Sequence, residues 1–237
     1  MSINVLLYSG GMDSFCLSKL YKFNKILFFI TGTLDNHKEL LQLYRAIEHG
    51  VINGNEVEII NFPLSKYELE NKIIPHRNSL LCLIASNYGN HIYIGTTAGD
   101  TTKDKDYVFK SQIEGILNYF GLDKHKNRDV GYPYQIMLPF QDLTKTQILR
   151  EYISKGNSIN DLLEYSRSCY TNADLECGVC RSCLRKAVAL QNNNICYQKI
   201  FKVDPLTITL SESDIAKMKT RVSEWEDYQQ AMDLHHG

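Results

Sequence analysis

The sequence predicts an α/β fold in which a parallel sheet carries helices on both faces. Short apolar runs of strand length alternate along the chain with stretches whose apolar residues recur at helical spacing. The runs are compact enough to be strands buried within a sheet, and polar or glycine-rich loops follow several of them. Parallel sheets of this kind bind ligands beyond the carboxyl ends of their strands, so those loops are the first candidates for a site.

Length and composition agree with one α/β domain plus a small appendage. The chain has 237 residues, and 26 Lys and Arg balance 27 Asp and Glu, so bulk nucleic-acid binding is not expected. The apolar run Ile26–Ile30, like the other apolar runs of the sequence, is far too short to span a membrane, and no signal-peptide pattern opens the chain. We therefore expect a cytoplasmic protein whose seven cysteines are metal ligands or free thiols, not disulfides.

The first strand, Val5–Leu7, runs into a Gly-Gly turn, and a helical pattern begins just after it at Phe15. Adjacent glycines let backbone N–H groups approach an anion, and a helix N-terminus adds N–H donors and a positive dipole end. Ser9 and Ser14 add hydroxyl donors. Asp13 would repel phosphates unless a divalent cation such as Mg²⁺ lies between them. The turn is therefore predicted to hold phosphates, with a ligand-free strand-to-helix turn as the alternative.

The following elements alternate regularly between strand and helix. Further strands are predicted at Lys25–Ile30, Glu56–Ile60, His91–Ile94 and Ile136–Leu138, because each is a short apolar or alternating run. Helices with an apolar face are predicted after the strands, over residues 40–51, 80–88, 109–120 and 144–153. This alternation is the pattern of a parallel sheet built from strand–helix–strand units.

Other polar segments fall at the carboxyl ends of strands or at the helix starts that face them. Pro75–Asn78 opens a helix with an arginine and an amide, and Gly95–Asp106 forms a polar loop after a strand. Lys145 lies in the first turn of a helix that Thr144 and Gln147 open at capping-box spacing. The helix dipole disfavours a cation there, so an anion is predicted nearby. Each segment is also compatible with an ordinary solvated surface.

A cluster of four cysteines is the strongest chemical signal after the first loop. Cys177, Cys180 and Cys183 repeat a Cys-x-x-Cys spacing, and Cys169 can return from across a turn. This density predicts a tetrahedral zinc site, with an iron–sulfur cluster as the less common alternative. Four thiolates leave the metal no open position, so its role is predicted to be structural. The remaining cysteines are predicted to be core residues: Cys16, Cys82 and Cys196.

These patterns divide the chain into three segments. A nucleotide-binding domain is expected over residues 1–160, a zinc-knuckle helical segment over 161–204, and a C-terminal helical extension over 205–237. In the extension, one helix is predicted to carry a single apolar face made of Ile215, Met218, Val222 and Trp225. This helix is either a docking helix or a dimer arm, and we expect a homodimer.

Together the motifs resemble the 7-cyano-7-deazaguanine synthase family, PP-loop ATP pyrophosphatases of the queuosine precursor pathway. The resemblance runs from about Ser9 to Ala187. It rests first on Ser-Gly-Gly-x-Asp-Ser at residues 9–14, on a Pro-x-Arg-Asn helix start at 75–78 and on a Gly-rich loop with aspartate at 95–106. It rests further on a Pro-Leu segment with a helix-opening lysine at 138–145, and on a Cys…Cys-Gly-x-Cys-x-x-Cys-x-x-Arg knuckle in Cys169 and residues 177–185.

The resemblance implies a PP-loop fold, related to the adenine nucleotide alpha-hydrolases, that uses ATP, Mg²⁺ and Zn²⁺. The implied reaction activates the carboxylate of 7-carboxy-7-deazaguanine as an acyl adenylate, lets ammonia form the amide, and then dehydrates the amide to the nitrile. Asp13 and Lys145 would act on the phosphates. The implied ATP-binding residues are Tyr8, Ser9, Gly10, Gly11, Met12, Asp13, Ser14 and Phe15. The implied substrate-binding residues are Arg77, Asn78, Asp100 and Asp106, and the implied zinc ligands are Cys169, Cys177, Cys180 and Cys183.

Two segments depart from the family pattern. Asp104–Val108 keeps an aspartate where the family usually reads Tyr-Pro-Asp-Cys-Arg, and Thr31–His37 keeps only the histidine of Asp-Tyr-Gly-Gln-Arg-His. One hypothesis is therefore a divergent member that stops at the amide, or that joins the acid to an amine on a macromolecule. Another is a PP-loop tRNA thiolase, which needs a reactive Cys16 or Cys82 near the loop. The last is a non-catalytic nucleotide-binding module.

Overall fold

The computed structural model of the protein describes residues 2–34, 36–70, 73–100, 102–121, 133–169, 171 and 173–236. Within this part of the chain, five parallel strands form one sheet in the order β3–β2–β1–β4–β5. The strands are β1 (Asn4–Tyr8), β2 (Lys25–Ile30), β3 (Val57–Asn61), β4 (His91–Ile94) and β5 (Gln135–Met137). The predicted parallel α/β sheet is confirmed, and each predicted strand lies within one residue of the observed one.

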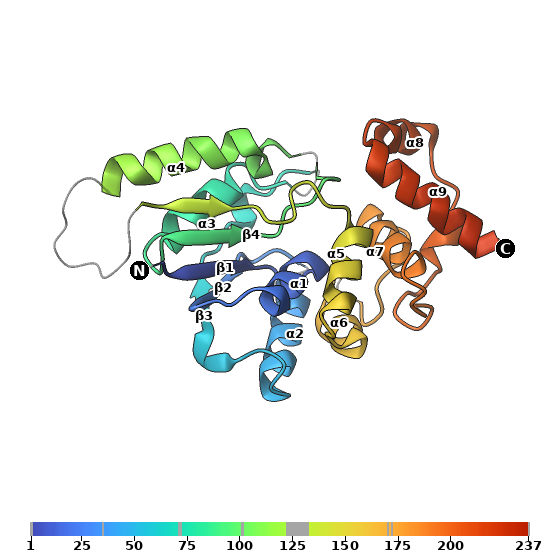
Figure 1. Cartoon of the computed structure of the whole chain (residues 1–237), viewed down its shortest axis with the longest axis horizontal. Coiled ribbons are helices and arrows are strands. Elements are labelled where there is room, and N and C mark those ends of the chain that lie inside the picture. Colours follow the sequence, from blue (N-terminus) through green and yellow to red (C-terminus); the bar gives the residue numbers. More distant parts are fainter. Residues whose placement is uncertain are drawn as a thin grey trace.

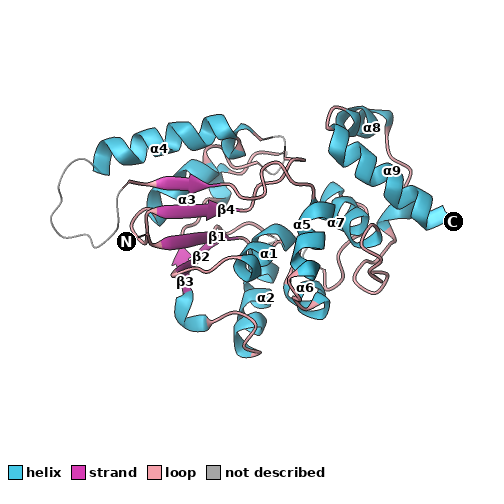
Figure 2. Ribbon diagram, in the orientation of Figure 1, coloured by secondary structure: helices cyan, strands magenta, loops and turns pink. Residues whose placement is uncertain are grey.

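Helices connect the strands and cover both faces of the sheet, which Figure 2 shows as a single layer of magenta arrows among cyan helices. The helices are α1 (Met12–Leu20), α2 (Asn36–Glu48), α3 (Arg77–Ala85), α4 (Tyr107–Gly121), α5 (Lys145–Ser154), α6 (Ile159–Tyr165), α7 (Arg181–Gln191), α8 (Glu212–Lys219) and α9 (Val222–His236). Short 3₁₀ turns lie at Gly54–Glu56, Ser65–Tyr67, Lys103–Lys105 and Pro205–Thr207. Helix α6 lies in a stretch for which the sequence patterns predicted no helix.

Side chains along the central strand alternate between two apolar cores. Leu6 and Tyr8 belong to the core that α1, α2, α5, α6 and α7 cover, whereas Val5 and Leu7 belong to the core beneath α3 and α4. Successive strand residues point to opposite faces, so a strand that is apolar throughout must be buried on both. The continuous apolar run in β1 therefore records a sheet with helices on each side.

The C-terminal extension differs from the prediction of one helix. Helix α8 ends at Lys219, and α9 begins at Val222 after a short turn. Met218 is buried, but Val222 is 65% exposed, so the expected single apolar face is divided between two helices. Figure 1 shows α8 and α9 (red) beyond α7, at the end of the molecule away from the sheet.

The prediction that Cys196 is a core residue is wrong. Cys196 is exposed in the turn after α7, and its thiol donates to Gln198 Oε1 at 3.0 Å. Its neighbour Tyr197 takes the buried position instead, at 1% exposure. Cys16 and Cys82 are fully buried, as predicted.

Candidate active site

The loop between β1 and α1 lies at the carboxyl end of the central strand. Gly10 has φ +72°, the left-handed region that favours glycine, and a Cβ there would lie 3.0 Å from Glu39 Cβ. Gly11 occupies the N-cap of α1, and no side chain from the described part of the chain caps the helix there. The amides of its first turn therefore remain available to an anion.

Two serines hold this loop in shape from within. The Ser14 hydroxyl donates to the Gly11 carbonyl at 3.0 Å, and the Ser9 N–H donates to Ser14 Oγ at 3.2 Å. The two hydroxyl oxygens also lie 3.2 Å apart. The loop is thus ordered without a ligand, which reduces the entropy lost when an anion binds.

A cavity of about 250 Å³ opens in front of this loop. It lies at the carboxyl ends of β1, β2 and β4, where Figure 1 shows the strands ending toward α5 and α7. The structure brings most of the predicted nucleotide and substrate residues together in its wall, namely Tyr8, Ser9, Gly11, Met12, Asp13, Ser14, Arg77, Asn78, Asp100 and Lys145. This is the place where a parallel sheet is expected to bind its ligand.

Three predicted site residues are placed elsewhere. Phe15 is fully buried in the core behind the loop, and Gly10 is buried with its carbonyl accepting from the Arg167 N–H at 2.8 Å. Asp106 precedes α4 and accepts from the Phe109 N–H at 2.8 Å, so its carboxylate acts as a helix cap. Whether these residues also contact a ligand stays a prediction.

Asp13 and Lys145 form an ion pair at the back of the cavity. Both carboxylate oxygens of Asp13 lie 2.5 Å from Lys145 Nζ, and the two side chains are 19% and 10% exposed. The predicted capping box is confirmed, because Thr144 accepts from the Gln147 N–H while the Gln147 side chain accepts from the Thr144 N–H. The anion beside this first-turn lysine is therefore a carboxylate of the protein, Asp13 in the first turn of α1.

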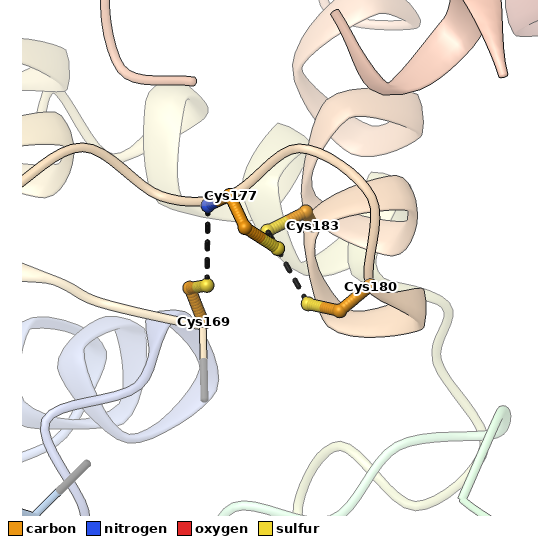
Figure 3. A group of neighbouring side chains, drawn as sticks. All are labelled: Cys169, Cys177, Cys180 and Cys183. Carbon is orange, nitrogen blue, oxygen red and sulfur yellow. Dashed lines mark hydrogen bonds between the residues drawn. The ribbon is translucent and has the colours of Figure 1, made fainter. Parts of the chain in front are cut away.

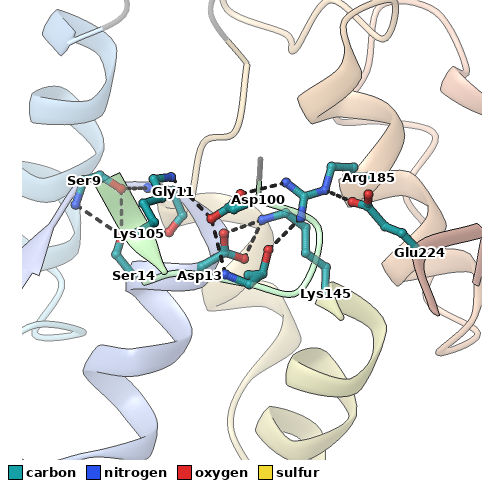
Figure 4. Close-up of polar contacts among 10 residues, drawn as sticks. Ser9, Gly11, Asp13, Ser14, Asp100, Lys105, Lys145, Arg185 and Glu224 are labelled. Carbon is teal, nitrogen blue, oxygen red and sulfur yellow. Dashed lines mark hydrogen bonds and ion pairs between the residues drawn. The ribbon is translucent and has the colours of Figure 1, made fainter. Parts of the chain in front are cut away.

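A second carboxylate on the cavity wall, that of Asp100, binds two cationic side chains (Figure 4). It accepts from Lys105 Nζ at 3.3 Å and from Arg185 Nη1 at 3.2 Å. Burial alone would raise the pKa of Asp100, but the charges of Lys105 and Arg185 outweigh it and hold this pKa below its ordinary value of 3.8. Asp100 is therefore ionised at neutral pH.

Arg77 and Asn78 open α3 at the cavity rim, as predicted. The Asn78 side-chain amide donates to the Asp104 carbonyl at 3.2 Å, so it ties the helix start to the polar loop after β4. His76, the N-cap of α3, has φ 58°, an uncommon left-handed conformation for a residue with a side chain. The start of α3 is thus connected through Asn78 to the loop that follows β4.

The segment that follows α6 supplies cavity residues that the sequence patterns did not predict: Arg167, Ser168, Ser182 and Arg185. The guanidinium of Arg167 donates to the carbonyls of Thr171 and Ala173, at 2.8 Å and 2.6 Å. Its backbone N–H meanwhile binds Gly10. Arg167 therefore connects Thr171 and Ala173 to the loop between β1 and α1.

The four cysteines predicted as zinc ligands converge, as Figure 3 shows. Their sulfurs all lie within 4.8 Å of one another, with Cys177–Cys183 at 3.8 Å and Cys180–Cys183 at 3.4 Å. Four thiolates about 2.3 Å from a tetrahedral zinc would lie about 3.8 Å apart, so the cluster fits zinc. The Cys177 N–H donates to Cys169 Sγ at 3.2 Å, a contact that stabilises a thiolate.

Glycine at position 178 is required for this cluster. Gly178 has φ +77°, and a Cβ there would overlap the Val203 carbonyl oxygen. The hydrogen bond with Cys180 and burial raise the pKa of the Cys183 thiol. A bound cation would favour the thiolate form instead. With four protein ligands the site would be closed, which is typical of structural zinc.

The cysteine pattern also departs from the family in one detail. The family pattern places an arginine three residues after the last cysteine, whereas Lys186 stands there and Arg185 is the second residue after Cys183. Lys186 is fully buried and pairs with Glu176 at 2.6 Å, while Arg185 reaches the cavity. Lys186 and Arg185, neighbours in α7, therefore face different surroundings, a buried carboxylate and the cavity.

A nucleophilic cysteine near the phosphate loop is not supported by the structure. Burial raises the pKa of the Cys16 thiol well above its ordinary range and raises that of Cys82 to about 12. Both side chains are fully buried. The condition that a thiolase reaction sets for either cysteine is thus not met.

Comparisons with known proteins place the chain next to one group of enzymes. The family model described as "Queuosine biosynthesis protein QueC" matches residues 31–194, more than half of the chain. The chain is 27% identical to 7-cyano-7-deazaguanine synthase 1 of Colwellia psychrerythraea, over 80% of this chain and 94% of that protein. It is 28% identical to the 7-cyano-7-deazaguanine synthases of Alteromonas mediterranea, over 81% and 96%, and of Methanosphaerula palustris, over 76% and 90%. None of the helices in the described residues has the length and apolar character of a membrane span.

Proposed function

Because the chain belongs to the family of the queuosine biosynthesis protein QueC, we propose that it is an ATP-dependent carbon–nitrogen ligase acting on 7-carboxy-7-deazaguanine. The observation that carries the proposal is the ion pair of Asp13 and Lys145 beside an open phosphate loop, in a cavity lined by further charged groups. The names of the similar synthases support 7-cyano-7-deazaguanine as the product, and 7-carboxy-7-deazaguanine is the acid that the family resemblance implies.

In the proposed reaction, the substrate carboxylate attacks the α-phosphorus of ATP and releases pyrophosphate, which leaves an acyl adenylate. Ammonia then attacks the acyl carbon and releases AMP, which leaves the amide. A second ATP activates the amide oxygen, and loss of that oxygen with AMP gives the nitrile of 7-cyano-7-deazaguanine. No protein nucleophile is needed, which agrees with the burial of Cys16 and Cys82.

The residues of the cavity suit the departure of a pyrophosphate. The loop amides and the hydroxyls of Ser9 and Ser14 would bind its oxygens. Lys145 would turn from Asp13 toward the phosphates and stabilise the negative charge that develops on the leaving group. Asp13 would then be free to hold Mg²⁺, which supplies charge neutralisation between carboxylate and phosphates.

We assign zinc to the four-cysteine cluster as a structural metal, held by Cys169, Cys177, Cys180 and Cys183. The divergent segments at Thr31–His37 and Asp104–Val108 keep two related outcomes open. The reaction could stop at the amide, or the activated acid could be joined to an amine on a macromolecule. Both use the same first step, so one assay covers them.

The test is incubation of the purified protein with ATP, Mg²⁺, ammonia and 7-carboxy-7-deazaguanine, followed by measurement of AMP, pyrophosphate and product mass. Nitrile supports the complete synthase reaction, and amide alone supports a reaction that stops early. AMP formation that needs a protein or RNA fraction in place of ammonia supports the macromolecular acceptor. ATP binding without AMP under every condition contradicts the ligase and supports a nucleotide-binding module.

A pair of lysine variants on α5 provides the control. Lys145→Met removes the cation beside Asp13, and we expect AMP formation to fall at least about 100-fold. Lys155→Met alters an exposed lysine at the other end of the helix and is expected to leave the rate unchanged. Equal rates for the two variants would remove Lys145 from the proposed mechanism.

A further inference from the structure

We propose that helix α9 is a working part of the candidate active site, in which Glu224 positions Arg185 against the cavity loop 97–100. The family model matches the chain only as far as residue 194, so α8 and α9 lie outside the matched stretch. The inference concerns how the cavity wall is built, and it rests on the proposed function only for the identity of the ligand.

The Glu224 carboxylate is enclosed by three guanidinium groups. It forms an ion pair with Arg185, lies 2.7 Å from Arg221 Nη1 and lies 3.7 Å from Arg181 Nη2. The Glu224 side chain is only 11% exposed. A carboxylate removed from water in this way needs compensating charge, and here α7 supplies two of the three cations from successive turns.

Arg185 carries the connection from α9 to the cavity wall. On the side away from Glu224, its guanidinium donates to Asp100 Oδ1 at 3.2 Å and to Thr97 Oγ1 at 2.6 Å (Figure 4). Its side chain is 17% exposed. Arg185 and Asp100 line the cavity, and Figure 4 shows Arg185 between Asp100 and Glu224. Glu224 therefore acts through Arg185 and is a positioning residue.

The contact between α7, α9 and the loop leaves no room for a side chain at position 99 unless Glu224 and Arg185 move. A Cβ built on Gly99 would overlap both Glu224 Oε1 and Arg185 Nη2. Within the loop, the Ala98 N–H donates to the Leu143 carbonyl at 3.0 Å, and the Asp100 N–H donates to the Thr97 carbonyl at 2.9 Å. Helix α7, helix α9 and the segment that carries Leu143 thus all contact the loop 97–100.

The consequence is a fixed carboxylate in the cavity. Asp100 is held from two sides, by Arg185 and by Lys105 at 3.3 Å, so its oxygens cannot swing freely. A fixed carboxylate recognises ligands that present N–H donors, such as the aminopyrimidinone ring of a deazapurine. Loss of the Glu224 charge would free Arg185 to follow solvent or other anions and would loosen this acceptor.

The experiment compares two isosteric substitutions on the same helix, Glu224→Gln and Glu226→Gln. Glu226 is exposed, so its variant controls for the chemical change alone. Hydrogen–deuterium exchange of the ligand-free proteins would be measured at Ala98 and Asp100. We expect faster exchange in Glu224→Gln only. Equal exchange in both variants would overturn the inference.

Binding provides the second readout. We expect Glu224→Gln to bind 7-carboxy-7-deazaguanine about tenfold more weakly than the wild type, about 1.4 kcal/mol, while ATP affinity is unchanged, because only the acid is proposed to contact Asp100. A merely structural role would weaken both ligands together. If the wild type itself does not bind the acid, the proposed function is wrong, and the exchange experiment still decides the role of α9.

Two further variants keep the test valid if Glu224→Gln folds poorly. Glu224→Asp retains the charge on a shorter side chain and is expected to recover most of the exchange protection at Ala98. Gly99→Ala leaves α9 intact but forces Glu224 and Arg185 from the loop, so exchange is expected to rise at Asp100. Unchanged exchange in Gly99→Ala would contradict the described contact.

Discussion

At the scale of single residues, conformation and charge at a few positions decide whether the cavity can hold an anion. Gly10 adopts a left-handed conformation against Glu39, and its neighbours Ser9 and Ser14 hold the loop around it. Asp13 and Asp100 each face a cation across the cavity wall. The wall is therefore built from paired charges that a ligand can separate.

Gly10→Ala is expected to destabilise the protein and to weaken ATP binding. An alanine in the left-handed conformation lowers the unfolding free energy by about 1–2 kcal/mol. Its Cβ would also lie too close to Glu39, which must move. Gly156→Ala is the matched control, since Gly156 has φ +76° with open space around its Cβ position. Urea unfolding and ATP titration of both variants check this. An equal loss of ATP affinity in the control would show that the loop itself is not involved.

We expect the ionisation of Asp100 to make part of the unfolding free energy depend on pH in the acid range. Burial raises its pKa, but Lys105 and Arg185 prevail and keep the folded-state pKa below 3.8. A group with a depressed pKa stabilises the fold above its unfolded pKa, and this contribution is lost as the pH falls through the folded pKa. The difference in unfolding free energy between wild type and Asp100→Asn should therefore be constant near neutral pH and shrink as the pH falls below the ordinary value of 3.8. A difference that is constant with pH would contradict the assignment.

At the scale of elements, the N-terminal half of α7 joins three parts of the protein. Cys183 belongs to the metal cluster, Arg185 reaches the cavity, and Lys186 is buried beside the knuckle. Lys186 pairs with Glu176 at 2.6 Å and donates to the Ser166 carbonyl at 3.1 Å. A single helix start therefore links the metal cluster to the cavity wall.

The buried pair of Glu176 and Lys186 is expected to respond to single and double substitution in different ways. Lys186→Met leaves a buried carboxylate unpaired, and we expect a loss of about 3–5 kcal/mol in unfolding free energy. Adding Glu176→Gln removes the second charge and should restore part of it. The exposed pair Arg45–Glu164 is the control, because Glu164→Gln should cost below about 1 kcal/mol. A double variant less stable than Lys186→Met would contradict this account.

At the scale of the whole molecule, the segment that carries Arg167 and Cys169 is hydrogen-bonded to the loop between β1 and α1. Cys169 follows Arg167 by two residues, and the Arg167 N–H binds the Gly10 carbonyl at 2.8 Å. The cysteine cluster is therefore connected, through Arg167, to the loop that is predicted to bind phosphates. The division into segments at residues 160 and 204, the homodimer and the cytoplasmic location stay predictions.

Removal of the metal is expected to weaken ATP binding. Without a cation at the four sulfurs, the loop that carries Arg167 loses its anchor at Cys169, and the contact with Gly10 loosens. Metal analysis, ATP titration and hydrogen exchange before and after chelation check this. Cys177→Ser should behave like the chelated protein, whereas Cys196→Ser, at an exposed cysteine outside the cluster, should not. Protein isolated anaerobically without zinc would remove the assignment.

The sequence by itself determined the five strands, most of the helices between them, the cysteine spacing and the capping box. Strand and helix alternation is a local property, so Lys25–Ile30 and His91–Ile94 were predicted with their observed bounds. The spacing of Cys177, Cys180 and Cys183 is also local, because a metal chelate depends on neighbouring ligands. The capping box at Thr144 belongs to the same class.

Only the tertiary structure decided which side chains meet. Arg185 stands 85 residues from Asp100, and Glu224 stands 39 residues from Arg185, so no periodicity or motif connects them. The break between α8 and α9 and the exposure of Cys196 were likewise not predicted from the sequence and are seen only in the structure. Contacts between distant segments are fixed by how the helices dock on the sheet, because docking depends on the shape and charge of the whole surface.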